Sequence, residues 1–151
     1  MTAADRTAML RALGLAREAA AAAEIPVGAV VVDADGRVLG EGRNAREATH
    51  DPTAHAEVVA LRAAAVTLGS WNLEGCTLVV TLEPCIMCAG AILQARIGRV
   101  VFGAWDDKAG AAGSMYDVLR DRRLPYRAEV VGGVEEEAAT ALLRDFFQQR
   151  R

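Results

Sequence analysis

Residues 77–88 read TLVVTLEPCIMC and join two patterns that decide the fold. Residues 77–81 form a β-rich run that is typical of a buried strand. Pro84 suits the first turn of a helix, and apolar residues then recur at helical spacing until Gly98. The segment therefore predicts a strand that runs directly into a helix, which is the βα unit of α/β proteins.

The same alternation of strands and helices extends in both directions from this segment. Before it we expect a helix at 4–23, a strand at 27–32, a returning strand at 37–43 after the Asp35-Gly36 turn, a loop at 44–51, and a helix from about Asp51–Thr53 to Gly69. After it we expect a strand at 99–102, a loop at 103–114 and a helix at 135–151. Without a repeat or a linker, the pattern predicts one α/β domain, 1–151.

Composition narrows the class of protein. Hydrophobic residues make up 52% and charged residues 25% of the 151 residues, as in an ordinary globular domain. No run of about 18 apolar residues and no signal peptide is present, so we expect no membrane association and a cytoplasmic location. Cysteines number three, and two of them form Cys85-x-x-Cys88. That odd count favours metal or redox chemistry over disulfides.

Two short motifs carry residues suited to metal chemistry, His55-Ala56-Glu57 and Pro84-Cys85-Ile86-Met87-Cys88. Cys85 and Cys88 are three apart and share one face of a helix. With His55 they offer two thiolates and an imidazole, a ligand set that suits Zn²⁺ and leaves a fourth position for water. Glu57 is expected to act as an acid and base beside that water, because it is poorly placed to be a fourth ligand.

Other interpretations of these motifs need weighing. A lone Cys-x-x-Cys also occurs in structural zinc sites and redox pairs, but the chain has no second such pair to close a structural site. A zinc-stabilised module without activity would have no use for Glu57. His-x-Glu followed by Pro-Cys-x-x-Cys is instead identified as the signature of zinc-dependent deaminases, in which the glutamate moves protons between water and base.

Longer stretches resemble the bacterial tRNA-specific adenosine deaminases. The matching segments span almost the whole chain and are 25–30, 50–57, 81–91, 96–103, 110–114 and 145–147. The resemblance implies a three-layer α/β/α sandwich of the cytidine-deaminase type, with a mixed central sheet of about five strands and helices on both faces. It also implies a homodimer with one Zn²⁺ per subunit that converts adenosine to inosine at the wobble position of a tRNA anticodon stem-loop, with an arginine tRNA as the expected substrate.

The resemblance further assigns residues to the substrate pocket. Asn44 is expected to hold the target base, and Asp106 to lie near the nucleotide and its ribose. The expected pocket wall consists of Val27, Ala56, Leu82 and Pro84. A deaminase of free bases or nucleosides would use the same metal centre, so that alternative stays open.

Recognition of RNA by an acidic protein requires a local basic surface. The chain has a net charge of −3, but residues 96–127 carry +3 and the remainder −6. The residues expected to contact RNA are Lys108, Arg120, Arg122, Arg123, Arg150 and Arg151. One of the neighbours Phe146 and Phe147 is expected in the core and the other, assigned as Phe147, near the RNA. Trp105 replaces an arginine common in similar proteins and offers an indole for stacking.

Overall fold

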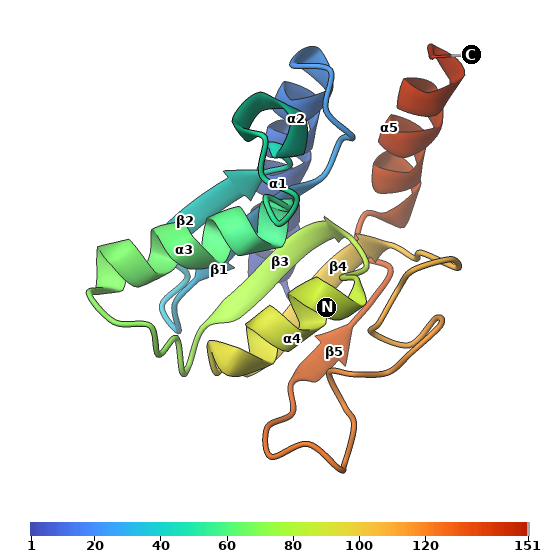
Figure 1. The fold of residues 1–151 in the computed structure, drawn as a ribbon. Coiled ribbons are helices and arrows are strands. Elements are labelled where there is room, and N and C mark those ends of the chain that lie inside the picture. Colours follow the sequence, from blue (N-terminus) through green and yellow to red (C-terminus); the bar gives the residue numbers. More distant parts are fainter. Residues whose placement is uncertain (151) are drawn as a thin grey trace.

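Helices cover both faces of a central five-stranded sheet in the computed structural model, which describes residues 1–150 (Figure 1). The elements follow in the order α1 (Ala3–Ala21), β1 (Gly28–Val32), β2 (Val38–Arg43), α2 (Arg46–Thr49), α3 (Ala56–Leu68), β3 (Thr77–Leu82), α4 (Ile86–Gln94), β4 (Arg99–Ala104), β5 (Glu129–Val131) and α5 (Glu136–Gln148). Arg151, expected at the RNA surface, lies outside the described residues.

The sheet is mixed, as the resemblance implied. Its strand order is β2-β1-β3-β4-β5. Strand β1 is antiparallel to both β2 and β3, whereas β3, β4 and β5 run parallel. Because β3 and β4 are parallel, their carboxyl ends meet at one edge of the sheet, which is also the edge where β1 begins.

Alternating side chains of the strands form two cores. Val30, Val79 and Val101 face α1 and α5, where they pack with Met9 and Leu13. The residues between them face α3 and α4 and form the larger core. This alternation, which follows from the pleat of a strand, produces the three layers and confirms the predicted α/β/α sandwich.

Helix α3 lies unusually close to the backbone of β2. A Cβ atom at Gly42 would meet the carbonyl oxygen of Ala56 and lie 2.6 Å from the nitrogen of Ala60. Gly40 makes the same kind of approach to Ala64, one helical turn further along. Two glycines on one face of β2 therefore set the distance and direction of α3, including its first turn.

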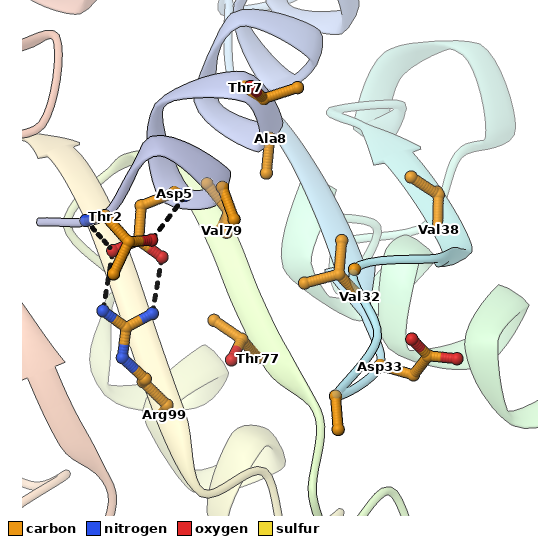
Figure 2. Close-up of a pocket in the computed structure, with 13 residues that line it drawn as sticks. Thr2, Asp5, Thr7, Ala8, Val32, Asp33, Val38, Thr77, Val79 and Arg99 are labelled. Carbon is orange, nitrogen blue, oxygen red and sulfur yellow. Dashed lines mark hydrogen bonds and ion pairs between the residues drawn. The ribbon is translucent and has the colours of Figure 1, made fainter.

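Helix α1 is fastened to the sheet at the edge opposite the start of α3. Figure 2 shows the Asp5 carboxylate facing the guanidinium of Arg99, with hydrogen bonds of 2.6 and 2.7 Å, and Thr2 beside it. Thr2 and Asp5 also cap the helix reciprocally. These residues border a pocket of about 350 Å³ that reaches Val32 and Thr77.

The structure corrects several predicted boundaries. The expected loop at 44–51 contains the single-turn helix α2, and β4 continues two residues into the expected loop at 103–114. Helix α3 begins at Ala56, not near Asp51–Thr53, and α4 begins at Ile86, after Pro84. The sequence pattern also missed β5. Within residues 1–150, no helix combines the length and apolar character needed to cross a membrane.

Candidate metal centre and base pocket

Two helix starts bring the predicted metal ligands together. His55 is the N-cap residue of α3, and Cys85 is the N-cap residue of α4. Both caps have extended backbone angles, so each side chain projects from the end of its helix. Cys88 follows in the first turn of α4 and is buried. The corrected helix starts therefore place two of the three ligands, His55 and Cys85, at the caps.

The three ligand atoms are close enough to share one ion. His55 Nδ1 lies 3.6 Å from the sulfur of Cys85 and 3.4 Å from that of Cys88, and all three atoms lie within 4.8 Å of one another. Ligands at about 2.0–2.3 Å around a tetrahedral ion are roughly 3.3–3.8 Å apart. The donor set of two sulfurs and one imidazole also suits zinc, so the residues fit the predicted ion.

The two thiols are electrostatically unequal. A hydrogen bond from Cys88 and contact with His55 lower the pKa of Cys85 to about 4. Interaction with Cys85, together with burial, raises the pKa of Cys88. The hydrogen bond with Cys85 also raises the pKa of His55. A thiolate beside an imidazole is an arrangement that attracts a cation.

Glu57 lies in the first turn of α3, next to this cluster. Only 4% of its surface is exposed, and burial raises the pKa of its carboxyl to about 7. A carboxyl with such a pKa can both accept and release a proton near neutral pH. Its position and its protonation behaviour both suit the proton-transfer role predicted from the sequence.

A pocket of about 330 Å³ opens over these residues. It is comparable in volume to the pocket at the opposite edge, so chemistry and not size distinguishes the two. The predicted residues that line it are Val27, Asn44, His55, Ala56, Glu57, Leu82, Cys85 and Asp106. Pro84 is not among its lining residues within the described chain; its carbonyl accepts a hydrogen bond from Ala111 N (2.8 Å).

Four further residues line the pocket and were missed by the sequence analysis, namely Ile25, Arg46, Glu83 and Ala109. Ile25 and Ala109 lie in loops, and Arg46 lies in α2, a helix that the sequence pattern did not predict. Glu83 lies inside the deciding motif, between a strand end and a metal ligand. Its position in the motif was the available signal, because a carboxylate next to a buried strand needs hydrogen-bond donors.

The polar groups of the pocket are held by local hydrogen bonds. Asn44 is buried, its Oδ1 accepts from Arg46 N (3.3 Å), and its Nδ2 donates to the carbonyl of Ile25 (3.4 Å). Asp106 Oδ1 accepts from the backbone nitrogens of Lys108 and Ala109. Both side chains are thus oriented before any substrate binds.

The predicted RNA-contacting residues are exposed but differ in how free their charges are. Arg120 pairs with Asp117 (3.0 Å) and Arg123 with Asp121 (2.7 Å), which reduces their net positive charge. Lys108 and Arg122 are exposed on the loops between β4 and β5. Lys108 is nearest to the pocket in sequence, since it lies between the lining residues Asp106 and Ala109.

The aromatic residues near these loops are partly packed. Phe146 is 7% exposed and Phe147 is 50% exposed, and Arg150 stacks on the Phe146 ring at 3.5 Å. Trp105 contacts Phe102 edge to face, with ring centroids 4.7 Å apart, and it remains accessible. The burial of Phe146 and exposure of Phe147 match the expected division, although the role of Phe147 in RNA binding stays a prediction.

Comparison with known proteins agrees with this geometry. Residues 2–104 match the family model described as the cytidine and deoxycytidylate deaminase zinc-binding region. This chain belongs to the cytidine and deoxycytidylate deaminase family. The metal cluster and Glu57 thus lie within the matched region of a zinc-binding deaminase, and the predicted family and cofactor are confirmed.

Two similar proteins have names more specific than that of the family. This chain is 50% identical to a tRNA-specific adenosine deaminase of Haemophilus influenzae over 97% of this chain and 85% of that protein. A solved tRNA:A34 deaminase structure superposes with a TM-score of 0.87 and 41% identity, covering 91% of this chain and 99% of the other. The resemblance to tRNA-specific adenosine deaminases is therefore confirmed.

A longer kind of relative also exists. This chain is 55% identical, over 96% of its length, to a tRNA(Ile)-lysidine synthase of Deinococcus deserti. It spans about a quarter of that protein, 27% of its length. A deaminase-like region therefore also occurs inside a much longer chain.

Proposed function

We propose that this deaminase converts adenosine to inosine at the wobble position of a tRNA anticodon, with an arginine tRNA as substrate. The observation that carries the proposal is the placement of a buried carboxyl, Glu57, beside the His55-Cys85-Cys88 cluster at the base of a pocket. The names of its relatives support tRNA as the substrate class. An anticodon loop suits such a pocket because its bases can leave the stack without opening a duplex.

The reaction adds water across the C6–N1 bond of adenine and expels ammonia, leaving inosine. Zinc held by His55, Cys85 and Cys88 would supply a Lewis acid that makes water nucleophilic. Glu57 accepts a proton from the attacking water and delivers it to N1. It then transfers the second proton of that water to the departing amino group. A pKa of about 7 suits both directions of transfer.

The walls of the pocket would select the base. Val27 and Leu82 present apolar surface to the faces of the ring, and the buried Asn44 offers an amide to the purine edge. Asp106 stands at the rim and would accept a hydrogen bond from the ribose. Lys108, beside it, would meet the phosphate backbone together with Arg120, Arg122, Arg123 and Arg150. Phe147 would stack against the RNA.

The proposal includes a homodimer. The face formed by α3 and α4 carries an apolar hollow of about 460 Å³ that includes Leu61, Trp71 and Ala91. Trp71, which lines the hollow, is strongly exposed, as is Val66 of α3. Such a surface favours self-association. Light scattering of the purified protein tests this part, and a monomer at micromolar concentration would contradict it.

The function is tested by incubating the zinc-loaded protein with the anticodon stem-loop of an arginine tRNA, and separately with free adenosine, guanine and cytosine. We expect inosine only in the RNA, at the wobble position. A stem-loop with guanosine in place of the wobble adenosine is the matched control. Turnover of a free base or nucleoside without inosine in the RNA would overturn the proposal in favour of the small-molecule alternative.

A further inference from the structure

Glu83 is a buried carboxylate that the reaction does not use. It is 2% exposed and lies between Leu82, which ends β3, and Pro84 and Cys85, which begin the metal-binding turn. Within the described chain no cation is paired with it. A buried carboxylate without a paired cation needs hydrogen-bond donors. The donors of Glu83 therefore show which part of the chain it fixes.

All four of its hydrogen bonds come from one loop, residues 105–117. Oε1 accepts from the backbone nitrogen of Asp106 (3.0 Å) and from the hydroxyl of Ser114. Oε2 accepts from the backbone nitrogens of Ala112 and Ser114, both at 3.0 Å. One carboxylate therefore ties the beginning of the loop to its middle, and both to the turn that carries Cys85.

The loop is shaped to let this carboxylate in. A Cβ atom at Gly110 would collide with the carboxylate of Glu83, so only glycine leaves the necessary space. Gly110 also forms a β-bridge with Cys85. The chain thus passes directly over Glu83 between the pocket rim and the metal ligand.

The beginning and the middle of this loop are held differently. Ala111 and Ala112 are fully buried, so packing fixes the middle of the loop even without Glu83. Residues 105–109 are mostly exposed. Asp106 is half-buried at the rim, and its backbone nitrogen donates a hydrogen bond to the Glu83 carboxylate. Two residues earlier in the chain, the carbonyl of Ala104 accepts a hydrogen bond from Glu83 N (2.8 Å). Glu83 therefore controls the position of Asp106 more than the stability of the whole loop.

We infer that Glu83 is a positioning residue that fixes the Asp106 rim of the substrate pocket relative to the metal-binding turn, and so sets the affinity for the substrate nucleotide. The inference rests on the proposed function, because it assigns Asp106 to the bound nucleotide. Glu83 acts through Asp106 and takes no part in the transfer of protons.

The substitution Glu83→Gln tests this selectively. The glutamine oxygen can replace Oε2 and keep the bonds from Ala112 and Ser114, and its amino group can donate to the Ser114 hydroxyl, which rotates to accept. The backbone N–H of Asp106 cannot reverse its role and then faces another donor. We therefore expect faster hydrogen exchange at the Asp106 amide, by about tenfold or more, with the Ala112 amide still protected.

The kinetic expectation is a KM for the anticodon stem-loop about tenfold higher, with kcat within about threefold of the original value. In an Asp106→Ala background the same substitution should add little, because its effect passes through Asp106. Asp5→Asn is the matched control, since Asp5 is also a buried carboxylate that accepts backbone and side-chain donors, but at the opposite edge of the sheet. It should leave KM unchanged.

The outcomes separate this inference from the proposed function. Unchanged KM and unchanged exchange at Asp106 in Glu83→Gln, or full additivity with Asp106→Ala, would overturn it. If the glutamine variant does not fold, Gly110→Ala takes its place, because its methyl group displaces the Glu83 carboxylate. We then expect a higher KM with zinc content retained, and an unchanged KM would overturn the inference. Absence of inosine with the unsubstituted protein would reject the proposed function, while the exchange measurement still decides whether Glu83 holds Asp106.

Discussion

His55 and Cys85 occupy equivalent positions on two different helices. Each is the N-cap of its helix, and His55 Nδ1 lies 3.6 Å from the Cys85 sulfur although 30 residues separate them. Side chains that usually cap helices satisfy backbone nitrogens, whereas these two face each other across the gap between α3 and α4. A metal ion at this point would join two helices that the sheet brings to the same edge.

Removal of a ligand should therefore cost both metal and stability. We expect His55→Ala and Cys88→Ala to reduce zinc from about one per chain to near zero, measured by elemental analysis. Zinc at 100 times its dissociation constant stabilises a fold by about 2.7 kcal/mol, so the unfolding temperature should fall with the metal. Cys76→Ala is the control, because Cys76 is buried away from the cluster and should leave zinc content unchanged.

Substitution of Glu57 should separate chemistry from metal binding. Glu57→Gln keeps the shape of the side chain but cannot accept a proton, so we expect turnover to fall by about 10²–10⁴-fold while zinc content stays the same. Single-turnover assays of inosine formation, with elemental analysis of the same sample, measure both. Activity close to that of the unsubstituted protein would show that another group moves the protons.

The Asp5–Arg99 pair predicts a dependence of stability on acid. The hydrogen bonds from Arg99 lower the pKa of Asp5 to about 2, from an ordinary value of 3.8. Between these two pH values the unfolded state therefore binds more protons than the folded state. The pair stabilises the folded state by about 2 kcal/mol above pH 4, and this stabilisation is lost as the pH falls toward 2. We expect urea unfolding curves of Asp5→Asn and the unsubstituted protein to differ at pH 7 and to converge near pH 2.

The exposed turn residue Asp35 provides the control for that experiment. Asp35→Asn should leave the free energy of unfolding unchanged at both pH values. If the free energies of unfolding of Asp5→Asn and of the unsubstituted protein differed by the same amount from pH 7 to pH 2, an electrostatic role for the Asp5–Arg99 pair would be contradicted.

The close approach of α3 to β2 predicts a steric effect. Gly42→Ala forces a methyl group against the backbone of α3, so we expect a loss of about 3 kcal/mol in the free energy of unfolding and weaker zinc binding, because His55 moves with the helix start. Gly14→Ala is the matched control. Gly14 lies within α1 with open space around it, and alanine there should stabilise the protein by about 1 kcal/mol. Equal effects of the two substitutions in thermal unfolding would reject this account.

Much of the fold could be predicted because long elements carry strong local patterns. The continuous apolar runs of β1 and β3 and the helical spacing in α3 and α4 were sufficient to identify these elements. The four-residue α2 could not be predicted, because it depends on Glu24, whose carboxylate accepts from the nitrogens of Glu47 and Ala48 more than twenty residues away. The three-residue β5 exists only through its pairing with β4.

The candidate site likewise contains residues that local sequence pattern predicts and residues whose positions depend on the path of the chain. The metal ligands could be predicted because residue type and short spacing, together with the deaminase signature, identify them, whereas the role of Glu57 stays a prediction. The positions of Arg46 and Ala109 on the pocket wall depend on the paths of loops, which local pattern does not encode. Helix starts were predicted a few residues too early for α3, because Asp51 and Thr53 have the composition of caps but bond to each other in a turn.

The position of the chain start, at the edge of the sheet opposite the base pocket, has a practical consequence for the design of fusion proteins. The start of α1 at Thr2 and the Asp5–Arg99 pair lie together at one edge of the sheet (Figure 2), and the base pocket lies at the other edge. An appended domain or affinity tag attached before Thr2 would leave from that distal edge and would not cover the pocket beside the metal ligands.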